Sequence, residues 1–200
     1  MSLEDLASKI RVCTLCPLSK SRTLAVPGEG PSDADLTFVG EGPGAEEDVQ
    51  GRPFVGAAGK YLDILLALIG LKREEVFITN IVKCRPPGNR APERGERDAC
   101  SPYLKAQIRI INPKLICTLG NTALETLTGV SSISRAHGKP LKKADRLFFP
   151  MYHPAAALHN PALKSTLESD MLKLKDTLNM LDTHSTTFEG ADTKLDDFLP

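Results

Sequence analysis

The stretch from Gly40 to Phe54 constrains this chain most, because it joins a glycine-rich backbone to several acids and one aromatic ring. It follows Asp35–Val39, a short apolar run rich in β-forming residues, which predicts a buried strand. The glycines end that strand and allow a flat ligand to approach the main chain closely. The stretch therefore predicts a pocket for a planar polar ring. The alternative is an ordinary strand-to-helix loop, in which the acids favour the helix dipole.

Further apolar runs of the same kind predict a sheet. They are Val76–Asn80, Leu115–Leu119 and Arg146–Pro150. The helical spacing of apolar residues predicts helices over 3–12, 57–70, 94–111, 121–127 and 161–181. Strands separated by helices form a parallel sheet that is covered on both faces. We therefore expect an α/β fold with a four-stranded parallel sheet and with ligands at the carboxyl ends of the strands.

Length and charge divide the chain into a body and a tail. The 200 residues suit one domain over 1–181, followed by an acidic tail over 182–200. The chain has 25 basic and 25 acidic residues; the tail holds five acids and one base, which leaves 24 basic and 20 acidic residues in the body. A mildly basic body permits nucleic-acid binding but does not require it. The tail has few apolar groups, so we expect it to be disordered.

The sequence shows no sign of a membrane or a secretory pathway. No apolar run reaches the roughly 18–20 residues of a membrane span. The first residues lack the basic and apolar segments of a signal peptide. We therefore expect a cytoplasmic protein that does not bind membranes.

Five cysteines in a cytosolic chain indicate metal binding or catalysis rather than disulfides. Cys13 and Cys16 form a two-residue-spaced pair before a proline, and Cys84 and Cys100 follow downstream. Four thiolates suit a structural zinc ion or an iron–sulfur cluster. The alternatives are a thioredoxin-like redox pair and four unrelated buried thiols. Cys117 lies inside a predicted strand, where we expect it to be a small buried apolar residue.

Two polar residues stand where the predicted strands end. Asn80 closes the second strand and His153 follows the fourth, so both lie at the expected ligand edge. The alternatives are a turn residue for Asn80 and a structural or solvated histidine for His153. The basic segment 83–92 could contact phosphates through Lys83, Arg85 and Arg90, or form a solvated loop around the metal site.

Four segments in this order resemble a family 4 uracil-DNA glycosylase, the iron–sulfur branch of the uracil-DNA glycosylase superfamily. They are Gly40–Gly44, Arg52–Gly56, Asn80–Pro87 and His153–Pro154, and the resemblance covers roughly residues 1–180. It implies a three-layer α/β/α sandwich, a monomer, and removal of uracil from DNA in base-excision repair, hence a nucleoid-associated enzyme. It also implies a [4Fe–4S] cluster as the cofactor, on Cys13, Cys16, Cys84 and Cys100.

The resemblance also implies roles in recognition and leaving-group chemistry. Uracil in a duplex must be flipped out before it can react. Phe54 would stack on the flipped ring, and Asn80 would bind the O4 and N3–H edge, which cytosine presents with opposite polarity. His153 would donate to uracil O2 and stabilise the leaving anion.

The water-positioning residue stays open. Other branches of the superfamily place an aspartate where this sequence has Gly42, so Glu41 or Glu47 would take that role, and we favour Glu47. Further expected contacts are Gly40, Gly42 and Asn89 to the substrate, a wedge at Leu158, and Arg85, Arg90, Arg135 and Lys139 to DNA. For Leu158 the alternative is a core residue at a helix start.

Three other interpretations of the whole chain remain. One is a glycosylase for other deaminated bases such as hypoxanthine, and another is a non-catalytic DNA-binding module with a structural metal. A zinc protein is the third. Residues 192–199 resemble a short sliding-clamp-binding peptide, although an acidic frayed end is the favoured interpretation of this segment.

Overall fold

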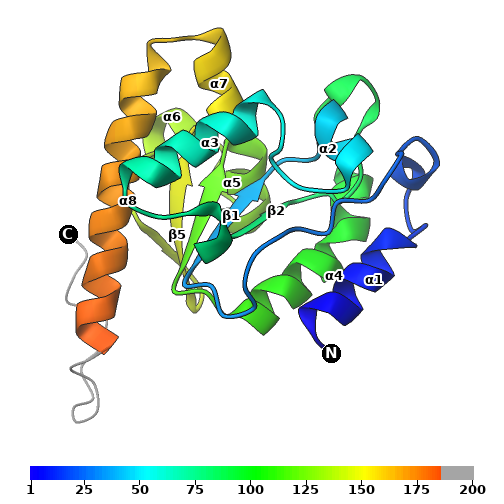
Figure 1. The fold of residues 1–200 in the computed structure, drawn as a ribbon, viewed down its shortest axis with the longest axis horizontal. Helices are drawn as coiled ribbons and strands as arrows, with labels where there is room; N and C mark the ends of the chain where they lie inside the picture. Colours follow the sequence, from blue (N-terminus) through cyan, green and yellow to red (C-terminus); the bar gives the residue numbers. More distant parts are fainter. Residues whose placement is uncertain (186–200) are drawn as a thin grey trace.

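In the computed structural model, which describes residues 1–185, five strands of that part of the chain form one sheet (Figure 1). The order across the sheet is β2-β1-β3-β5-β4. The strands are β1 (Leu36–Gly40), β2 (Phe77–Asn80), β3 (Leu115–Leu119), β4 (Leu141–Lys143) and β5 (Arg146–Met151). Strands β1, β2, β3 and β5 pair in parallel, which confirms the predicted parallel strands.

Strand β4 was not predicted from the sequence. It pairs antiparallel with β5 at the sheet edge, with Lys142 opposite Leu147. Its three residues contain two lysines and are mostly exposed, so no apolar run marks it. A short, charged edge strand also protects the sheet from pairing with another chain. The sheet therefore has one more strand than the four expected.

Helices cover both faces of the sheet, as predicted. One face carries α3 (Ala57–Leu68), α7 (Pro154–His159) and α8 (Leu163–Ser185), which contact one another. The other face carries α1 (Leu3–Arg11), α4 (Arg94–Ile111) and α5 (Asn121–Thr128). The remaining helical segments are α2 (Ala45–Gln50), α6 (Ile133–Ala136), and the 3₁₀ turns η1 (Pro17–Lys20), η2 (Arg73–Glu75) and η3 (Pro87–Asn89).

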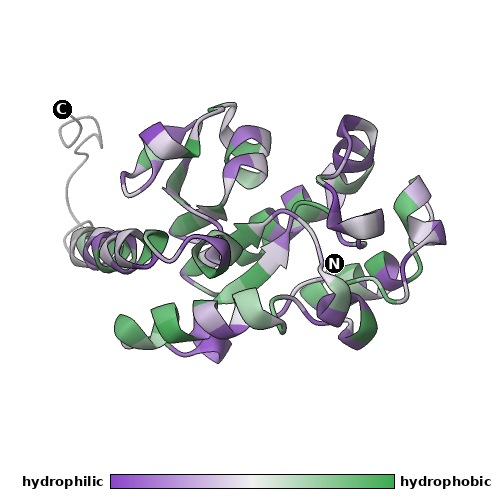
Figure 2. Ribbon diagram, turned by 90° about the horizontal axis from the view of Figure 1, so that it is seen from above, coloured by the Kyte–Doolittle hydropathy of each residue, from purple (hydrophilic) through white to green (hydrophobic). Residues whose placement is uncertain are grey.

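Side chains alternate between two cores because successive strand residues point to opposite faces. In β1, Phe38 joins the core under α3 and α8, whereas Val39 joins the core under α1 and α4. In β5, Phe149 and Phe148 divide in the same way. Figure 2 shows the hydrophobic strands between the two helical layers. Burial on both faces explains why these strands are continuously apolar.

The predicted tail begins inside a helix and then leaves the described part of the chain. Helix α8 continues to Ser185, which is beyond the predicted boundary at residue 181. The rest of the tail, including the segment 192–199, lies outside the described residues, so the predicted disorder and the clamp-binding peptide stay predictions. Within residues 1–185, none of the helices is both long enough and apolar enough to cross a membrane.

Candidate functional site

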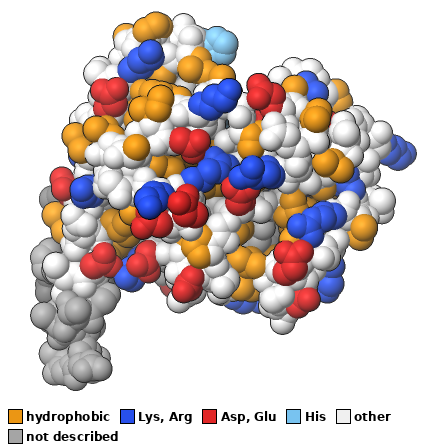
Figure 3. Space-filling model, viewed as in Figure 1, with side chains coloured by type: hydrophobic (Ala, Val, Ile, Leu, Met, Phe, Trp, Pro, Cys, Tyr) orange, Lys and Arg blue, Asp and Glu red, His pale blue; other side chains and the backbone are white. Residues whose placement is uncertain are grey.

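A cleft of about 390 Å³ opens where the parallel strands end. Figure 3 shows the surface hollowed at the top of the view, between the part that carries α7 and the part that carries α2. The cleft is lined by residues that follow β1, β2, β3 and β5: Glu41, Gly42, Pro43, Gly44, Glu47, Phe54, Ala58, Asn80, Pro86, Asn89, Arg90, Leu119, Gly120, Asn121, Thr122, His153 and Ala155. The structure thus brings most of the predicted catalytic and substrate-binding residues together at the edge where open parallel sheets bind ligands.

Asn80 lines this cleft and carries a buried, unpaired acceptor. Its side chain is 2% exposed, and its Oδ1 atom has no hydrogen-bond partner among the described residues. An unpaired buried acceptor costs about 1–3 kcal/mol, so such an atom is expected to find its partner in a ligand. Gly40 leaves the necessary space, because a Cβ atom there would lie 2.5 Å from Asn80 Oδ1 and 2.7 Å from Phe54 Cζ.

Phe54 forms the aromatic wall of the site. Its ring centroid lies 5.5 Å from that of His153, and the two rings are inclined by 26°. The residue is 5% exposed and belongs to the core beneath α3. Its φ angle of 50° is in the left-handed region, which is strained for a residue with a Cβ atom. The backbone around it must therefore be held in place.

The hydrogen bonds of His153 define its tautomer. The Nδ1 atom accepts a hydrogen bond of 3.2 Å from the N–H of Ala155, at the start of α7. A neutral imidazole that accepts at Nδ1 carries its proton on Nε2. Although His153 borders the open cleft, the protein around its ring lowers the pKa of the imidazole to about 4 by desolvation, against an opposing effect of Glu47. At neutral pH the ring is therefore uncharged and donates through Nε2.

Glu47 holds the backbone of the aromatic loop. Its Oε1 atom accepts hydrogen bonds of 2.9 Å from the N–H groups of Val55 and Gly56, and its Oε2 atom accepts one of 3.1 Å from Gly44. The side chain is buried with these partners. Glu47 thus lines the cleft, as predicted, but both oxygens support the loops around it.

Glu41 also lines the cleft. Its Oε2 atom accepts a hydrogen bond from the hydroxyl of Thr122, in the first turn of α5. The residue is partly exposed. Thr122 was not singled out from the sequence, although its position just after the end of β3 is a signal that could have identified it. Gly42 lies between the two acids, where a Cβ atom would be 2.9 Å from Val82 Cγ2.

The basic segment around η3 lies at one side of the cleft. Arg90 forms two hydrogen bonds with the buried carboxylate of Glu96, at 2.8 and 2.6 Å. Arg85 donates to Asn89 Oδ1 at 2.8 Å, and Asn89 lines the cleft. These contacts shape the loop, while the predicted roles in binding DNA or substrate stay predictions.

The structure corrects the prediction that Lys83 contacts phosphates. Its side chain is 1% exposed, and its Nζ atom donates to Thr79 Oγ1, to the carbonyl of Asn80 and to Gln107 Oε1, at 2.5–2.8 Å. Burial lowers the pKa of this ammonium to about 8. Lys83 therefore supports the strand end that carries Asn80 and does not reach the surface.

The remaining predicted DNA contacts lie outside the cleft. Arg135 in α6 and Lys139 after it are exposed, and Leu158 in α7 is 45% exposed. Because Leu158 is exposed, it is not a core residue, which excludes the alternative considered for it. An exposed apolar side chain on α7 is compatible with the predicted wedge. The structure does not test contact with DNA for any of the three.

The four predicted metal ligands surround a second, narrow cavity. It is lined by Cys13, Cys16, Cys84 and Cys100, and burial raises the pKa of the Cys84 and Cys100 thiols. Cys117 lies elsewhere, fully buried in β3, which confirms its predicted role as a core residue. The structure therefore separates the fifth cysteine from the other four.

Hydrogen-bond donors surround these sulfur atoms. Arg22 Nη1 donates to Cys84 Sγ at 2.9 Å, and the N–H of Lys83 lies 3.3 Å from Cys100 Sγ. The pKa of Tyr103 is raised to about 12, and the main cause is a side-chain hydrogen bond with Cys13. Nothing in the sequence pattern singled out Arg22 or Tyr103. Donors of this kind suit sulfur that carries negative charge.

The cavity between the four cysteines is the candidate metal site. In the described residues, no three Cys, His, Asp or Glu side chains converge closely enough to hold one metal ion. The four cysteines nevertheless border one cavity. Four thiolates at one cavity suit a structural zinc ion or an iron–sulfur cluster.

Comparison with known proteins identifies relatives of this chain. The family model described as the uracil DNA glycosylase superfamily matches residues 27–174. The chain is 49% identical over 185 residues to the type-4 uracil-DNA glycosylase of Sulfurisphaera tokodaii, covering 88% of this chain and 84% of that protein. It is 48% identical over 188 residues to that of Saccharolobus solfataricus, covering 89% and 87%. Over 183 residues it is 44% identical to that of Archaeoglobus fulgidus, covering 86% and 92%.

Proposed function

We infer that this chain, which belongs to the uracil DNA glycosylase superfamily, removes uracil from DNA by hydrolysing the bond between the base and its sugar. The reaction leaves an abasic site and is a step of DNA repair. The relatives named above do not favour a glycosylase for hypoxanthine or a non-catalytic DNA-binding module. The enzyme is therefore a monofunctional glycosylase.

One observation carries this function: Asn80, which lines the cleft together with Phe54, has a buried Oδ1 atom without a hydrogen-bond partner in the described chain. An Oδ1 acceptor complements the N3–H group of uracil, and the neighbouring amide donor complements O4. Cytosine presents an acceptor at N3 and a donor at N4, so it would leave both groups of Asn80 unpaired in a buried site. Unpaired buried groups reject the wrong ligand strongly.

His153 stabilises the leaving group. The target nucleotide is first turned out of the stack, which places uracil against Phe54. As the glycosidic bond breaks, negative charge develops on the base and is greatest near its oxygens. The Nε2–H group of His153 donates to O2 there, in a site where a preoriented donor is most effective. Because the imidazole pKa is about 4, this donor is present in its neutral form at physiological pH.

Glu41 is the carboxylate that we assign to the attacking water. Glu47 was favoured from the sequence, but its two oxygens already accept three backbone hydrogen bonds. The Glu41 side chain is more exposed than that of Glu47. In the described residues it accepts a hydrogen bond from the hydroxyl of Thr122 through Oε2. A carboxylate that retains acceptor capacity at the cleft can orient a water toward the sugar cation. Glu47 then holds the loops and lies near enough to His153 to favour its charged form.

We also propose a [4Fe–4S] cluster bound by Cys13, Cys16, Cys84 and Cys100. Support comes from the shared cavity and from the hydrogen-bond donors on the sulfur atoms. When bound, the cluster ties the N-terminal segment to α4 and to the loop after β2. It supplies structural support rather than chemistry, because four protein ligands leave no open position.

DNA is the proposed partner, and a monomer in the cytoplasm, near the nucleoid, is the proposed state. The exposed candidates for contacts beyond the base are Arg135, Lys139 and Leu158. Arg85 is partly buried, and Arg90 lies at the cleft. Binding of a sliding clamp through residues 192–199 is tested by pull-down with and without the segment 190–200. Equal recovery of the two forms would exclude that partner.

The function is tested with a matched pair of histidine variants. His153→Ala should abolish release of uracil from an oligonucleotide while melting temperature and DNA affinity are retained. His159→Ala changes an exposed residue on the same short helix and should leave the rate unchanged. A His153→Ala protein that is folded and releases uracil at the wild-type rate would contradict the proposed function of this site.

A further inference from the structure

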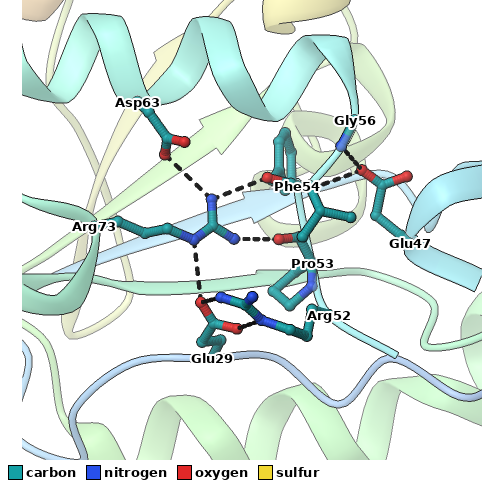
Figure 4. A network of polar contacts seen from close by, with 9 residues as sticks. Glu29, Glu47, Arg52, Pro53, Phe54, Gly56, Asp63 and Arg73 are labelled. Carbon is teal, nitrogen blue, oxygen red and sulfur yellow. Dashed lines mark hydrogen bonds and ion pairs between the residues drawn. The ribbon is translucent and has the colours of Figure 1, made fainter. Parts of the chain in front are cut away.

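Arg73 contacts the backbone of the aromatic loop although it lies about twenty residues away in the sequence. It belongs to η2, and its side chain is 17% exposed. Its Nη1 atom donates a hydrogen bond of 2.9 Å to the carbonyl of Phe54, and its Nη2 atom donates to the carbonyl of Pro53 (Figure 4). The guanidinium therefore bridges two consecutive carbonyls at the strained residue.

Two carboxylates fix the orientation of this guanidinium. Arg73 Nε donates to Glu29 Oε1 at 3.1 Å, and Arg73 Nη1 donates to Asp63 Oδ1 at 3.2 Å. Glu29 also binds Arg52, through hydrogen bonds of 2.6 and 2.9 Å, and these arginines lower the pKa of its carboxyl. A planar guanidinium with several fixed partners keeps its remaining donors in a defined direction.

The backbone at Phe54 needs such support. Its φ angle of 50° is strained for a residue other than glycine, and such a conformation persists only where the surroundings impose it. Helix α3 packs against the same peptide group, since a Cβ atom at Gly59 would lie 1.8 Å from the Phe54 carbonyl oxygen. Glu47 holds the next two N–H groups. Arg73 supplies the contacts to the carbonyl side of the strained residue.

We propose that Arg73 is a positioning residue for uracil excision, which holds Phe54 in its left-handed conformation so that the ring faces the flipped base. This proposal rests on the proposed function. The arginine touches neither the cleft nor the reacting atoms, so it acts through Phe54. Its removal should weaken the stacking of uracil without changing the exposed surface that would meet the DNA backbone.

The test compares Arg73→Gln with Arg52→Gln. Arg52 donates two hydrogen bonds to the same carboxylate of Glu29. Unlike Arg73, it has no hydrogen bond to the backbone of Phe54 in the described residues. Arg73→Gln should lower the single-turnover rate of uracil release by about tenfold and weaken inhibition by free uracil. Its affinity for abasic DNA should be unchanged, and Arg52→Gln should behave as wild type in all three measurements.

A second background separates positioning from stability. Glycine adopts a positive φ without strain, so in a Phe54→Gly protein the added Arg73→Gln change should cause no further loss of rate. A general loss of stability would instead reduce the melting temperature and the rate in both backgrounds. If Arg73→Gln does not fold, Arg73→Lys, which cannot bridge both carbonyls while binding Glu29, is measured in its place. Equal rates for the Arg73 and Arg52 variants, beside an active wild type, would overturn this inference. An inactive wild type would overturn the proposed function itself.

Discussion

Replacing Gly40 with alanine would place a methyl group between the two groups that recognise the base. The added Cβ would lie 2.5 Å from Asn80 Oδ1 and 2.7 Å from Phe54 Cζ, closer than real contacts allow. Because Gly40 is not among the residues with positive φ, alanine fits its backbone, and the clash lies in the site. The side chain of Asn80 or the ring of Phe54 must then move.

The magnitude follows from what that movement removes. Loss of two hydrogen bonds to the base in a buried site corresponds to about 2–3 kcal/mol. At 1.36 kcal/mol per tenfold, kcat/KM for uracil release should fall by roughly 30- to 160-fold. The fold should lose little, since the affected groups border a cleft.

Gly95→Ala is the matched control. Gly95 lies in the first turn of α4, and a Cβ atom there meets no other atom within 4 Å. Alanine in a helix stabilises by about 0.5–1 kcal/mol relative to glycine, so the control should be fully active and slightly more stable. Single-turnover release of uracil and thermal melting are measured for both variants. Activity of Gly40→Ala within threefold of wild type would refute the assignment of Asn80 and Phe54 to the base.

Further predictions concern the acid, the histidine and the cluster. Glu41→Gln should slow uracil release by roughly 100-fold with unchanged affinity for abasic DNA, because it removes the carboxylate that orients the water. The pKa of His153 is about 4 in the folded protein and about 6.5 in the unfolded chain, so between these values only the unfolded state takes up the proton. From pH 7 to pH 5 the wild type should therefore lose roughly 2 kcal/mol more stability than His153→Gln. The difference is measured as a larger fall in the melting temperature of the wild type. Cys100→Ser should lose iron and visible absorbance, whereas Cys117→Ser should retain both.

Each of these expectations has a contrary result. Normal turnover by Glu41→Gln would move the water-positioning role to another residue. Parallel pH profiles of melting temperature for wild type and His153→Gln would mean that the imidazole is protonated as readily in the folded state as in the unfolded state. Stoichiometric zinc in a colourless wild-type protein would replace the cluster with a zinc site.

The parallel sheet and the edge that carries the site could be predicted from the sequence. Strands buried on both faces are continuously apolar, so Leu115–Leu119 can be predicted as a strand from its own residues alone. Polar residues directly after such runs, Asn80 and His153, must then meet at one edge because the strands are parallel. The strands and the polar residues at their ends can therefore be predicted from short segments of the sequence.

Other features depend on contacts between distant segments and could not be predicted. The burial of Lys83 depends on Gln107 in α4, which supplies its acceptor. The support of Phe54 by Arg73 arises because η2 lies beside the loop, and no local pattern marks it. Strand β4 is short and charged, so its pairing partner, rather than its own sequence, makes it a strand.

The proposed excision of uracil is tested most directly by measuring release of free base from a duplex oligonucleotide that contains one uracil, in the presence of a chelator. The same duplex with cytosine at that position is the control. Free uracil, one abasic site per uracil and no release of cytosine are expected, because the Asn80 amide complements only the uracil edge. Release of both bases, or of neither by a folded protein, would contradict this expectation.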